Sequence, residues 1–437
     1  MSNTANARQA ALEALMRCRR DNAWSGDVLD NIVKRDGLDR RDTALASRLC
    51  LGVLQNDRLC DFYIDSYCHS KLEPPVRDIL RLGVYQLLFL DRIPARAAVS
   101  ESVELCRKKG YARAAGLVNA VLRRVADTDK LPEIPGEGTT AYLSTRYSHP
   151  EWLCNCIADR NGYAFAEAFL KKNNTPPKLF IQVNTLKVTT DDYIRALQRA
   201  DLAFQIMEPD GCIALEGGVA AQLPGFEEGL FYVQDRAARL AVEIAAPEPG
   251  MHVLDACACP GGKSFAAAIR MGNRGSILSC DIHEKKLHLL ESGAERLGIG
   301  CIQTRPADAR RFDPALENAF DLVIADVPCS GFGVIAKKPE IRKKKPEELA
   351  GLAEIQSSIL DTLSRYVKPG GTLLYSTCTI LKEENESVVL QFLETHKSFR
   401  GESFSCCGLA SDSGMYTFWP NIDETDGFFA AKLRRTV

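Results

Sequence analysis

Apolar residues in the first 130 positions recur at intervals of three and four, which is the spacing of one face of an α-helix. Short breaks that carry Gly, Pro or Asp separate four segments with this spacing: 7–20, 43–67, 76–90 and 112–127. The pattern predicts an all-α bundle over residues 1–130. Two Pro and two Gly within residues 129–140 then mark a domain boundary.

The segment after this boundary mixes two periods. Residues 147–160 and 162–170 have helical spacing, whereas 179–187 and 230–235 alternate as strands do, with a further helical segment at 191–200. The pattern predicts a small α+β module over residues 141–238.

From residue 239 to residue 437, strands and helices alternate regularly. The predicted strands are 252–257, 275–281, 301–308, 320–327 and 371–377, and each is almost continuously apolar. Such strands are buried on both faces, as in a parallel, doubly wound α/β sheet. We therefore predict a Rossmann-like domain, in which ligands bind beyond the carboxyl ends of the strands.

Composition is that of a soluble globular protein with two or three domains, since 46% of the 437 residues are hydrophobic and 26% are charged. The formal net charge of −2 gives no overall attraction to nucleic acid. However, residues 1–130 hold 22 Lys and Arg against 17 Asp and Glu, and a basic segment runs from Lys337 to Lys345. Local basic patches bind phosphate backbones, but a solvated surface of mixed charge has the same composition.

No apolar signal-peptide region begins the chain, and no apolar run reaches the roughly 18 residues of a spanning helix. We therefore expect a cytoplasmic protein with no membrane partner. The 16 Cys are scattered through apolar runs without any C-x-x-C spacing, which indicates reduced thiols rather than a disulfide framework. The C-x-C pairs and "HEKKLH" lack zinc-site spacing, so no metal is expected.

A glycine turn follows the first strand of the predicted sheet, in "DACACPGGKS" from Asp255 to Ser264. The dinucleotide fingerprint G-x-G-x-x-G is absent. The second strand ends at Asp281, where an acidic side chain accepts hydrogen bonds from ribose hydroxyls, and the third ends at Asp308, placed for an adenine edge. A cofactor that carries adenosine but no pyrophosphate fits this pattern, so S-adenosylmethionine fits better than NAD.

Two thiols follow the ends of the fourth and fifth predicted strands. Cys329 comes shortly after Asp326, and Cys378 comes shortly after Ser376. A free Cys is commonly a small buried hydrophobe, and either thiol taken singly fits that interpretation. Their shared position at the ligand-binding edge of one sheet favours a chemical role.

These motifs resemble those of the NOL1/NOP2/Sun family of RNA cytosine-5 methyltransferases. The matching stretches are "DACACPGGKS", "ADVPCSGFGVI", "KKPEIR", "LLYSTCTI", "EENE" and "DGFFAAKL". The N-terminal bundle resembles the NusB-like RNA-binding domain, and the chain as a whole is similar to the Fmu/Sun (RsmB) branch, which modifies 16S ribosomal RNA in bacteria. The resemblance implies a multidomain fold with an all-α NusB-like RNA-binding bundle, a small α+β module that binds RNA or serves as a linker, and an α/β Rossmann-like methyltransferase domain.

The resemblance also implies catalytic roles for four residues. Carbon 5 of cytosine is a poor nucleophile, and addition of a thiolate at carbon 6 activates it, which is covalent catalysis. Cys378 matches the family nucleophile, Cys329 the thiol that assists product release, and Asp326 the acid that hydrogen-bonds the cytosine N3 edge. Lys263 either raises the thiolate or carboxylate population nearby or is a solvated residue at a helix start.

The cofactor contacts follow from the same resemblance. It implies contacts to S-adenosylmethionine from Cys257, Ala258, Cys259, Pro260, Gly261, Gly262, Lys263, Asp281, Asp308 and Asp326. Three positions depart from the family pattern. Cys259 replaces an Ala and adds a thiol open to oxidation, Ser264 replaces a common Thr, and Phe332 replaces a smaller residue and alters the shape of the base pocket.

Three alternatives differ in substrate or in catalysis. An amino methyltransferase acting on adenine would carry an Asp/Asn-Pro-Pro-aromatic loop, which "DVPC" is not. A non-catalytic RNA-binding assembly factor would not need the intact thiols and acidic strand ends. A transfer RNA substrate keeps the same chemistry, and only analogy with NusB-like domains favours ribosomal RNA. We expect RNA as the partner, no DNA, and a monomer.

Overall fold

The structure, a computed structural model, describes residues 6–21 and 23–436. The chain forms two compact units, one of Met1–Thr175 with Ile335–Lys344 and the other of Pro176–Val334 with Lys345–Val437. Each unit is described separately below. The division into segments 1–130, 141–238 and 239–437 stays a prediction.

The first unit is built from helices, which confirms the all-α prediction for the N-terminal region. Its α-helices are α1 (Ala7–Asp21), α2 (Ser25–Asp36), α3 (Arg40–Gln55), α4 (Asp57–Tyr67), α5 (Pro74–Phe89), α6 (Ala95–Lys108), α7 (Ala115–Ala126), α8 (Thr140–Tyr147), α9 (Glu151–Asn161) and α10 (Tyr163–Asn173). Its short 3₁₀ helices are η1 (Ala112–Ala114), η2 (Thr128–Lys130) and η5 (Pro339–Lys343). Helical spacing extends without interruption over residues 43–67, but α3 ends at Gln55 and α4 begins at Asp57. Asn56, between them, donates its side-chain amide to the Gly52 carbonyl.

Close helix packing forms the core of the first unit. Buried residues of α1 through α7 make one apolar cluster between Ala7 and Val125. Helices α3 and α5 meet at Gly52, where a Cβ atom would lie 2.0 Å from the ring of Tyr85. Only glycine fits at this contact, so the aromatic ring packs directly on the backbone of α3.

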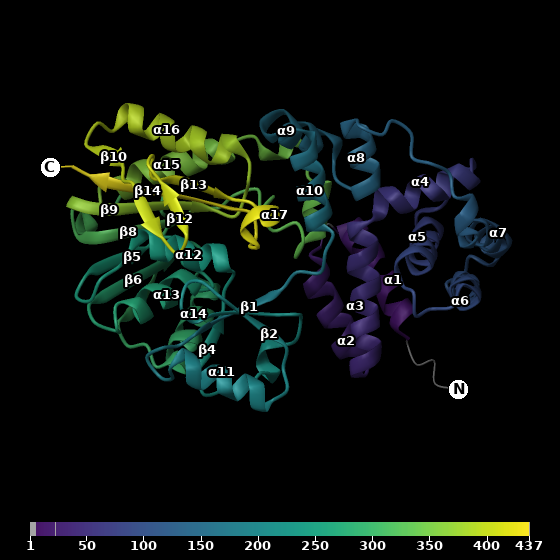
Figure 1. The fold of residues 1–437 in the computed structure, drawn as a ribbon, viewed down its shortest axis with the longest axis horizontal. Coiled ribbons are helices and arrows are strands. Elements are labelled where there is room, and N and C mark those ends of the chain that lie inside the picture. The colour runs from purple at the N-terminus through teal and green to yellow at the C-terminus, as the bar shows by residue number, and fades with distance from the viewer. Residues whose placement is uncertain (1–5, 22, 437) are drawn as a thin grey trace. The chain divides into compact units, whose positions relative to one another are not determined.

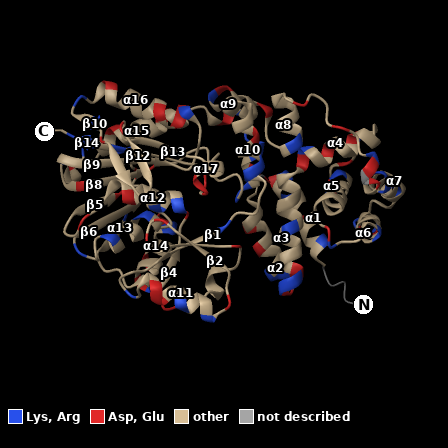
Figure 2. Ribbon diagram, in the orientation of Figure 1, with Lys and Arg blue, Asp and Glu red and all other residues tan. Residues whose placement is uncertain are grey.

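The basic segment from Lys337 to Lys345 has two environments. Lys338, Lys343 and Lys345 are exposed, whereas Arg342 is buried in the first unit and donates to backbone carbonyls of Gln55, Tyr147, Ser148 and Asn173. The Arg342 side chain therefore anchors η5 and does not contribute to a surface that binds phosphates. Figure 2 shows blue and red positions mixed along α1 to α7, so the basic surplus of this region does not form a face of one sign in that view.

The second unit contains a small antiparallel sheet in the order β2-β3-β1-β4. Its elements are β1 (Leu179–Val183), β2 (Phe204–Met207), β3 (Cys212–Leu215), β4 (Phe231–Val233), α11 (Thr190–Arg199) and η3 (Ala220–Gln222). Tyr193 and Leu197 of α11 pack on Ile181 and Phe231 of the sheet. The expected α+β character of this region is confirmed, and β2 and β3 add two strands that were not predicted.

The larger sheet of the second unit has the order β10-β14-β9-β8-β5-β6-β7, with β13 paired to β14. Its strands are β5 (His252–Asp255), β6 (Ser276–Asp281), β7 (Ile302–Pro306), β8 (Phe320–Asp326), β9 (Val367–Thr377), β10 (Phe399–Gly401), β13 (Met415–Phe418) and β14 (Phe428–Arg435), and β11 (Phe404–Cys406) and β12 (Leu409–Ser411) form a separate hairpin. Strands β5 to β9 are parallel, as predicted. The sheet is mixed, however, because β14 runs antiparallel to β9.

Helices cover both faces of this sheet (Figure 1). They are α12 (Arg236–Ala245), α13 (Gly262–Arg270), α14 (Glu284–Leu297), α15 (Leu352–Ser364), α16 (Glu386–Thr395) and α17 (Pro420–Asp423), with the 3₁₀ helices η4 (Pro314–Leu316), η6 (Pro346–Leu349) and η7 (Lys382–Glu384). Leu322 and Ile324 of β8 pack with α12 and α13, whereas Val323 and Ala325 pack with α15 and α16. Successive residues of β8 thus pack against helices on opposite faces of the sheet, which explains why the strand is apolar along its whole length. The Rossmann-like fold is confirmed.

Candidate active site

Two thiols meet at the carboxyl edge of the large sheet. Strands β8 and β9 are parallel neighbours, with Asp326 opposite Ser376. The chain continues three residues from Asp326 to Cys329 and two from Ser376 to Cys378, and the two Sγ atoms lie 3.1 Å apart. Residues 49 positions apart in sequence therefore share one hydrogen bond.

The electrostatic surroundings of the two thiols differ. The hydrogen bond from Cys329 lowers the pKa of Cys378, and the charge of Lys263 lowers it further against opposing effects of burial and Asp326. The same hydrogen bond, burial and the charge of Glu384 raise the pKa of Cys329 well above its ordinary value. The pair thus consists of one thiol that favours the thiolate and one that retains its proton, which suits nucleophilic addition followed by proton transfer.

An ion pair with a buried cation and a partly exposed carboxylate lies beside Cys378. Lys263 Nζ is 2.6 Å from Asp326 Oδ2, and the Lys263 side chain is only 9% exposed. Ser376 Oγ donates to the other oxygen of Asp326 at 2.8 Å, and the Lys263 ammonium lies over the Phe428 ring, 4.9 Å from its centroid. Lys263 is the second residue of α13, but its side chain is buried, so it is not a solvated residue at the helix start. A buried cation of this kind needs its counter-charge.

The loop between β5 and α13 turns back on itself at Gly261. This residue has φ of +113°, and a Cβ atom there would lie 2.6 Å from Phe265 Cζ and 2.9 Å from Leu290 Cγ. Both the backbone conformation and the available space therefore require glycine. The turn is closed by the Gly261 amide, which donates to the Ala258 carbonyl at 2.7 Å.

A cavity of about 510 Å³ opens beside this loop. Its lining includes Cys257, Ala258, Cys259, Pro260, Gly262, Lys263 and Asp326. The volume is in the range of small-molecule sites. Seven of the ten residues expected to contact the cofactor thus face one cavity.

Asp281 and Asp308 stand at the ends of β6 and β7, as predicted from the strand pattern. Asp281 is buried and accepts from the amides of Cys259 (3.2 Å) and His283 (2.8 Å), so it fixes the loop after β5. Asp308 forms a two-point ion pair with Arg310, which lowers the pKa of Asp308 to about 2. Asp308 lines a second cavity of about 350 Å³, separate in its lining from the first.

Asp255, at the end of β5, was singled out only as the start of the motif. It is fully buried, and burial raises its pKa to about 7. Ser264 Oγ donates to its Oδ2 at 2.7 Å, whereas Oδ1 has no hydrogen-bond partner among the residues the structure describes. A lone buried acceptor on the wall of the 510 Å³ cavity marks a place for a donor from a bound molecule.

Two further thiols, those of Cys257 and Cys259, lie in the loop after β5, and the surroundings of both disfavour the thiolate. Burial raises the pKa of Cys257, and burial together with Asp281 raises the pKa of Cys259 to about 12. Because the thiolate is the form that reacts with oxidants, oxidation of Cys259 is slowed by its surroundings. Phe332 is fully buried, so its larger ring is accommodated in the interior.

Sequence reasoning missed several residues that hold the thiols in place. Glu384, from the "EENE" stretch, is buried and accepts from the Ser330 amide at 2.9 Å. Gly333 and Gly427 touch through their backbones, and a Cβ atom on Gly333 would lie 1.7 Å from the Gly427 carbonyl oxygen. Glu384 lies in the charged stretch "KEENES" (382–387), so no local pattern shows that this carboxylate is the buried one, and no local pattern pairs the two glycines.

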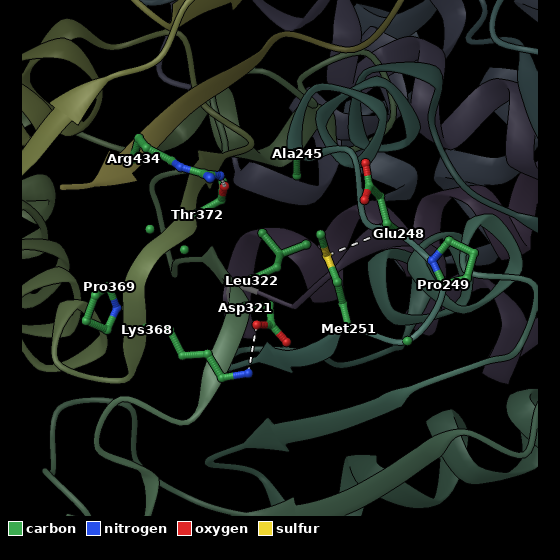
Figure 3. Close-up of a pocket in the computed structure, with 13 residues that line it drawn as sticks. Ala245, Glu248, Pro249, Met251, Asp321, Leu322, Lys368, Pro369, Thr372 and Arg434 are labelled. Atoms are coloured by element: carbon green, nitrogen blue, oxygen red, sulfur yellow. Dashed lines mark hydrogen bonds and ion pairs between the residues drawn. The ribbon is translucent and has the colours of Figure 1, made fainter. Parts of the chain in front are cut away.

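Another cavity lies at the opposite, amino-terminal ends of the parallel strands (Figure 3). It has a volume of about 390 Å³, and its lining includes Glu248, Met251, Asp321, Lys368 and Arg434. Lys368 is neutralised by Asp321 at 2.7 Å, as the dashed line in Figure 3 marks. None of the predicted site residues lines this cavity.

Three family models match successive parts of the chain. The NusB family matches residues 5–127, a ferredoxin-like domain of RsmF/B-like methyltransferases matches residues 149–222, and "16S rRNA methyltransferase RsmB/F" matches residues 242–434. Within the described residues, no helix is both long and apolar enough to cross a membrane.

Similar proteins extend along nearly the whole chain. The chain is 35% identical to a probable ribosomal RNA small subunit methyltransferase B of Bacillus subtilis, over 98% of this chain and 99% of that protein. It is 32% identical to ribosomal RNA small subunit methyltransferase B of Erwinia tasmaniensis, over 93% and 94%. The crystal structure of a protein named PH0851 superposes with a TM-score of 0.82 at 26% identity, over 98% of both chains.

These matches confirm the resemblance that the motifs indicated. They place the helical segment in the NusB family and the thiol-bearing sheet in the methyltransferase family. With its domains matched in order and its full-length relatives above 30% identity, the chain belongs to the family of ribosomal RNA small subunit methyltransferase B, whose members are rRNA methyltransferases.

Proposed function

We propose that this protein transfers a methyl group from S-adenosylmethionine to carbon 5 of a cytosine in 16S ribosomal RNA, at the family position cytosine 967, through a covalent bond between Cys378 and carbon 6. The single observation that carries the chemistry is the pair of thiols 3.1 Å apart at the carboxyl edge of the sheet. Methylation at an exocyclic amine would have no use for two such thiols.

The residues beside the glycine turn fit S-adenosylmethionine. The cavity that they line is large enough for a small molecule, and the unpartnered oxygen of Asp255 on its wall supplies an acceptor. The proposed contact from Asp281 would come from the end of β6, whereas Asp308 lines a separate cavity and is paired with Arg310. Cys257 to Lys263 would hold the cofactor from one side. When bound there, S-adenosylmethionine supplies an electrophilic methyl group.

Cys378 acts as the nucleophile in this mechanism. Its pKa is lowered by the hydrogen bond from Cys329 and by the charge of Lys263, so its thiolate forms more readily than that of an ordinary thiol. The thiolate adds to carbon 6 of the base, and carbon 5 gains the nucleophilic character that it lacks in cytosine.

Asp326 and Lys263 orient the base during this addition. Asp326 is the last residue of β8, and one of its oxygens pairs with Lys263 while the other accepts from Ser376. Its carboxyl group would hydrogen-bond the N3 edge of cytosine and favour attack at carbon 6. Lys263 balances the negative charge of Asp326, which otherwise opposes formation of the Cys378 thiolate.

Cys329 acts after the methyl transfer. The hydrogen on carbon 5 leaves as a proton and the bond between Cys378 and carbon 6 breaks, so a base must stand within reach of carbon 5. Cys329 is the nearest thiol to Cys378, and its raised pKa makes its thiolate the stronger base of the pair. Once Cys378 has become a thioether, its charge no longer raises the pKa of Cys329. Cys329 would then release its own proton to solvent and receive the carbon 5 proton, directly or through a relay.

The test is to identify the product. Purified enzyme is incubated with 16S ribosomal RNA and methyl-labelled S-adenosylmethionine, and the RNA is digested to nucleosides and analysed by mass spectrometry. Label in 5-methylcytidine, mapped by bisulfite sequencing to one cytosine and absent with Cys378→Ala, is expected. Label in an exocyclic amine, or label only on transfer RNA, would contradict the proposal.

A further inference from the structure

Glu384 contacts the loop that carries Cys329. It ends η7, is 3% exposed, and its Oε2 accepts from the Ser330 amide at 2.9 Å and from the Gln356 side-chain amide at 2.9 Å. The Ser330 amide belongs to the peptide that directly follows Cys329. The Glu384 carboxylate therefore accepts a hydrogen bond from the backbone amide of the residue that follows Cys329.

The position of Glu384 is itself held from several directions. Tyr375 of β9 donates its hydroxyl to the Glu384 backbone carbonyl at 2.6 Å, and Gln356 also donates to the Pro328 carbonyl at 3.0 Å. Ser330 Oγ lies 2.9 Å from Thr379 Oγ1, so the residues after each thiol are hydrogen-bonded to one another. Glu384 therefore belongs to a network that spans both thiol loops.

The other oxygen of Glu384 is not used by this network. Within residues 6–21 and 23–436, Oε1 is buried without a hydrogen-bond partner. Two amides already fix the loop through Oε2, so a neutral amide side chain would suffice for a purely mechanical tether. Burial of a charged carboxylate costs free energy, and a Gln side chain would accept the same hydrogen bonds without this cost. The carboxylate at position 384 therefore indicates an electrostatic role.

Charged groups approach the two thiols from different elements. Lys263 from α13, Asp326 at the end of β8 and Asp426 before β14 act on Cys378. Glu384 from η7 acts on Cys329, and Tyr375, whose hydroxyl donates to the Glu384 backbone carbonyl, has its pKa raised by burial and by the charges of both groups. At Cys378 the ammonium of Lys263 offsets the carboxylate of Asp326, and Asp426 has the smallest of the three effects, whereas no cation is among the main groups that act with Glu384 on Cys329.

We propose that Glu384 is a positioning residue for the methyl transfer, which holds the Cys329 loop by the Ser330 amide and sets its charge beside Cys329, so that Cys378 is the thiol that ionises first. This inference rests on the proposed roles of the two thiols. A single mobile proton shared by two thiols 3.1 Å apart goes to the sulfur with the more negative surroundings. Glu384 thereby keeps the proton on Cys329 until Cys378 has attacked the base.

The inference is tested by alkylation of the full-length protein without RNA or cofactor. Substoichiometric iodoacetamide is added between pH 7 and 9, and mass spectrometry measures the labelled fraction of the Cys329 and Cys378 peptides. In the wild-type protein we expect Cys378 to be labelled at least roughly tenfold faster than Cys329, which corresponds to one pKa unit in thiolate population. In Glu384→Gln, whose amide oxygen still accepts from Ser330, this ratio should fall by about fivefold or more.

Two variants serve as controls. Glu383→Gln removes the charge of the neighbouring exposed carboxylate and should leave the ratio unchanged. Glu384→Asp keeps the charge while shortening the side chain, and should also leave labelling at Cys378. Melting curves show whether each variant is folded, and Glu384→Asp remains informative if Glu384→Gln is not.

The outcomes separate this inference from the proposed function. An unchanged ratio in folded Glu384→Gln, or a shift of label to Cys329 in Glu384→Asp, would overturn the role of Glu384 and leave the roles of the thiols intact. Preferential labelling of Cys329 in the wild-type protein would instead overturn the assignment of Cys378 as the nucleophile, and the inference with it.

Discussion

Lys263 Nζ lies 2.6 Å from Asp326 Oδ2, and this ion pair joins the cofactor loop to the end of β8. Lys263 follows the glycine turn, whereas Asp326 precedes Cys329 by three residues. The two halves of the proposed reaction, cofactor binding and attack on the base, are thus connected through one salt bridge.

Removal of this cation should shift the reactivity of Cys378 to higher pH. In Lys263→Met, Asp326 loses its counter-charge and its carboxylate acts unopposed on Cys378, so the pKa of that thiol rises. The rate of Cys378 alkylation as a function of pH should have its midpoint displaced upwards by about one unit or more. Lys285→Met, at an exposed position on α14, is the matched control and should show no displacement.

The two thiol variants should differ in the covalent RNA adduct that they form. Cys329→Ala retains attack and methyl transfer but lacks the proposed base for the carbon 5 proton, so it should accumulate an enzyme–RNA adduct. A denaturing gel should show a shifted band that nuclease removes.

Cys378→Ala and the double variant should give no such band, since attack never occurs. A band from Cys378→Ala but not from Cys329→Ala would mean that the two roles are reversed. Normal turnover in Cys329→Ala without any band would leave Cys329 as a buried apolar side chain.

Loss of the Asp281 carboxylate should weaken cofactor binding. Asp281→Ala removes the proposed ribose acceptor and also frees the Cys259 and His283 amides, so the loop after β5 loses an anchor. We expect a loss of about 1–3 kcal/mol in the free energy of S-adenosylmethionine binding, the scale of lost hydrogen bonds at a buried polar group.

Titration calorimetry measures this loss directly. Glu284→Ala, at an exposed position three residues further along the chain, provides the baseline. Unchanged affinity in Asp281→Ala would refute the ribose role.

Asp255 should make the stability of the protein depend on pH. Burial raises its pKa from 3.8 to about 7, so the folded state binds a proton that the unfolded state has released. The contribution of Asp255 to stability is therefore highest below about pH 4, falls as pH rises towards 7, and remains low above it.

Asp255→Asn should remove this dependence. The difference in melting temperature between variant and wild type should move in favour of the variant from pH 5.5 to pH 8, and an exposed control, Asp412→Asn, should show no such trend. A constant difference across this range would show that Asp255 does not titrate there.

The segment of residues 1–130 should fold alone and bind RNA weakly. Its apolar cluster, from Ala7 to Val125, lies wholly within that segment, and the segment carries the basic surplus. Filter binding should show an affinity that falls as salt rises, because counterions are released from the RNA backbone. If filter binding detects no RNA affinity at low salt, the RNA-binding role of residues 1–130 is refuted and the segment has only a structural role.

Local sequence patterns predicted the elements that present the site. The apolar runs of β5 to β9 located the strand ends, and so located Asp281, Asp308, Asp326, Cys329 and Cys378 at one edge, because alternation and length within a strand are local properties. Pairing between strands that are far apart in the sequence leaves no comparable local pattern, so the strand order could not be predicted in this way. The four-residue strands β2 and β3 escaped prediction since their patterns are too short to stand out, and β14 joined the sheet antiparallel to β9 through contacts far apart in sequence.

The sequence by itself determined the class of fold, the glycine turn and the two thiols at strand ends, since each depends on residues close together in the chain. Only the tertiary structure decided that Cys329 and Cys378 share a hydrogen bond, that Lys263 pairs with Asp326, and that Glu384 reaches the Cys329 loop. It also buried Arg342, which composition had counted in a basic surface segment. The reason is physical: the strength of a charge and the pKa of a thiol depend on burial and on neighbours, and strand order brings those neighbours together from distant parts of the chain.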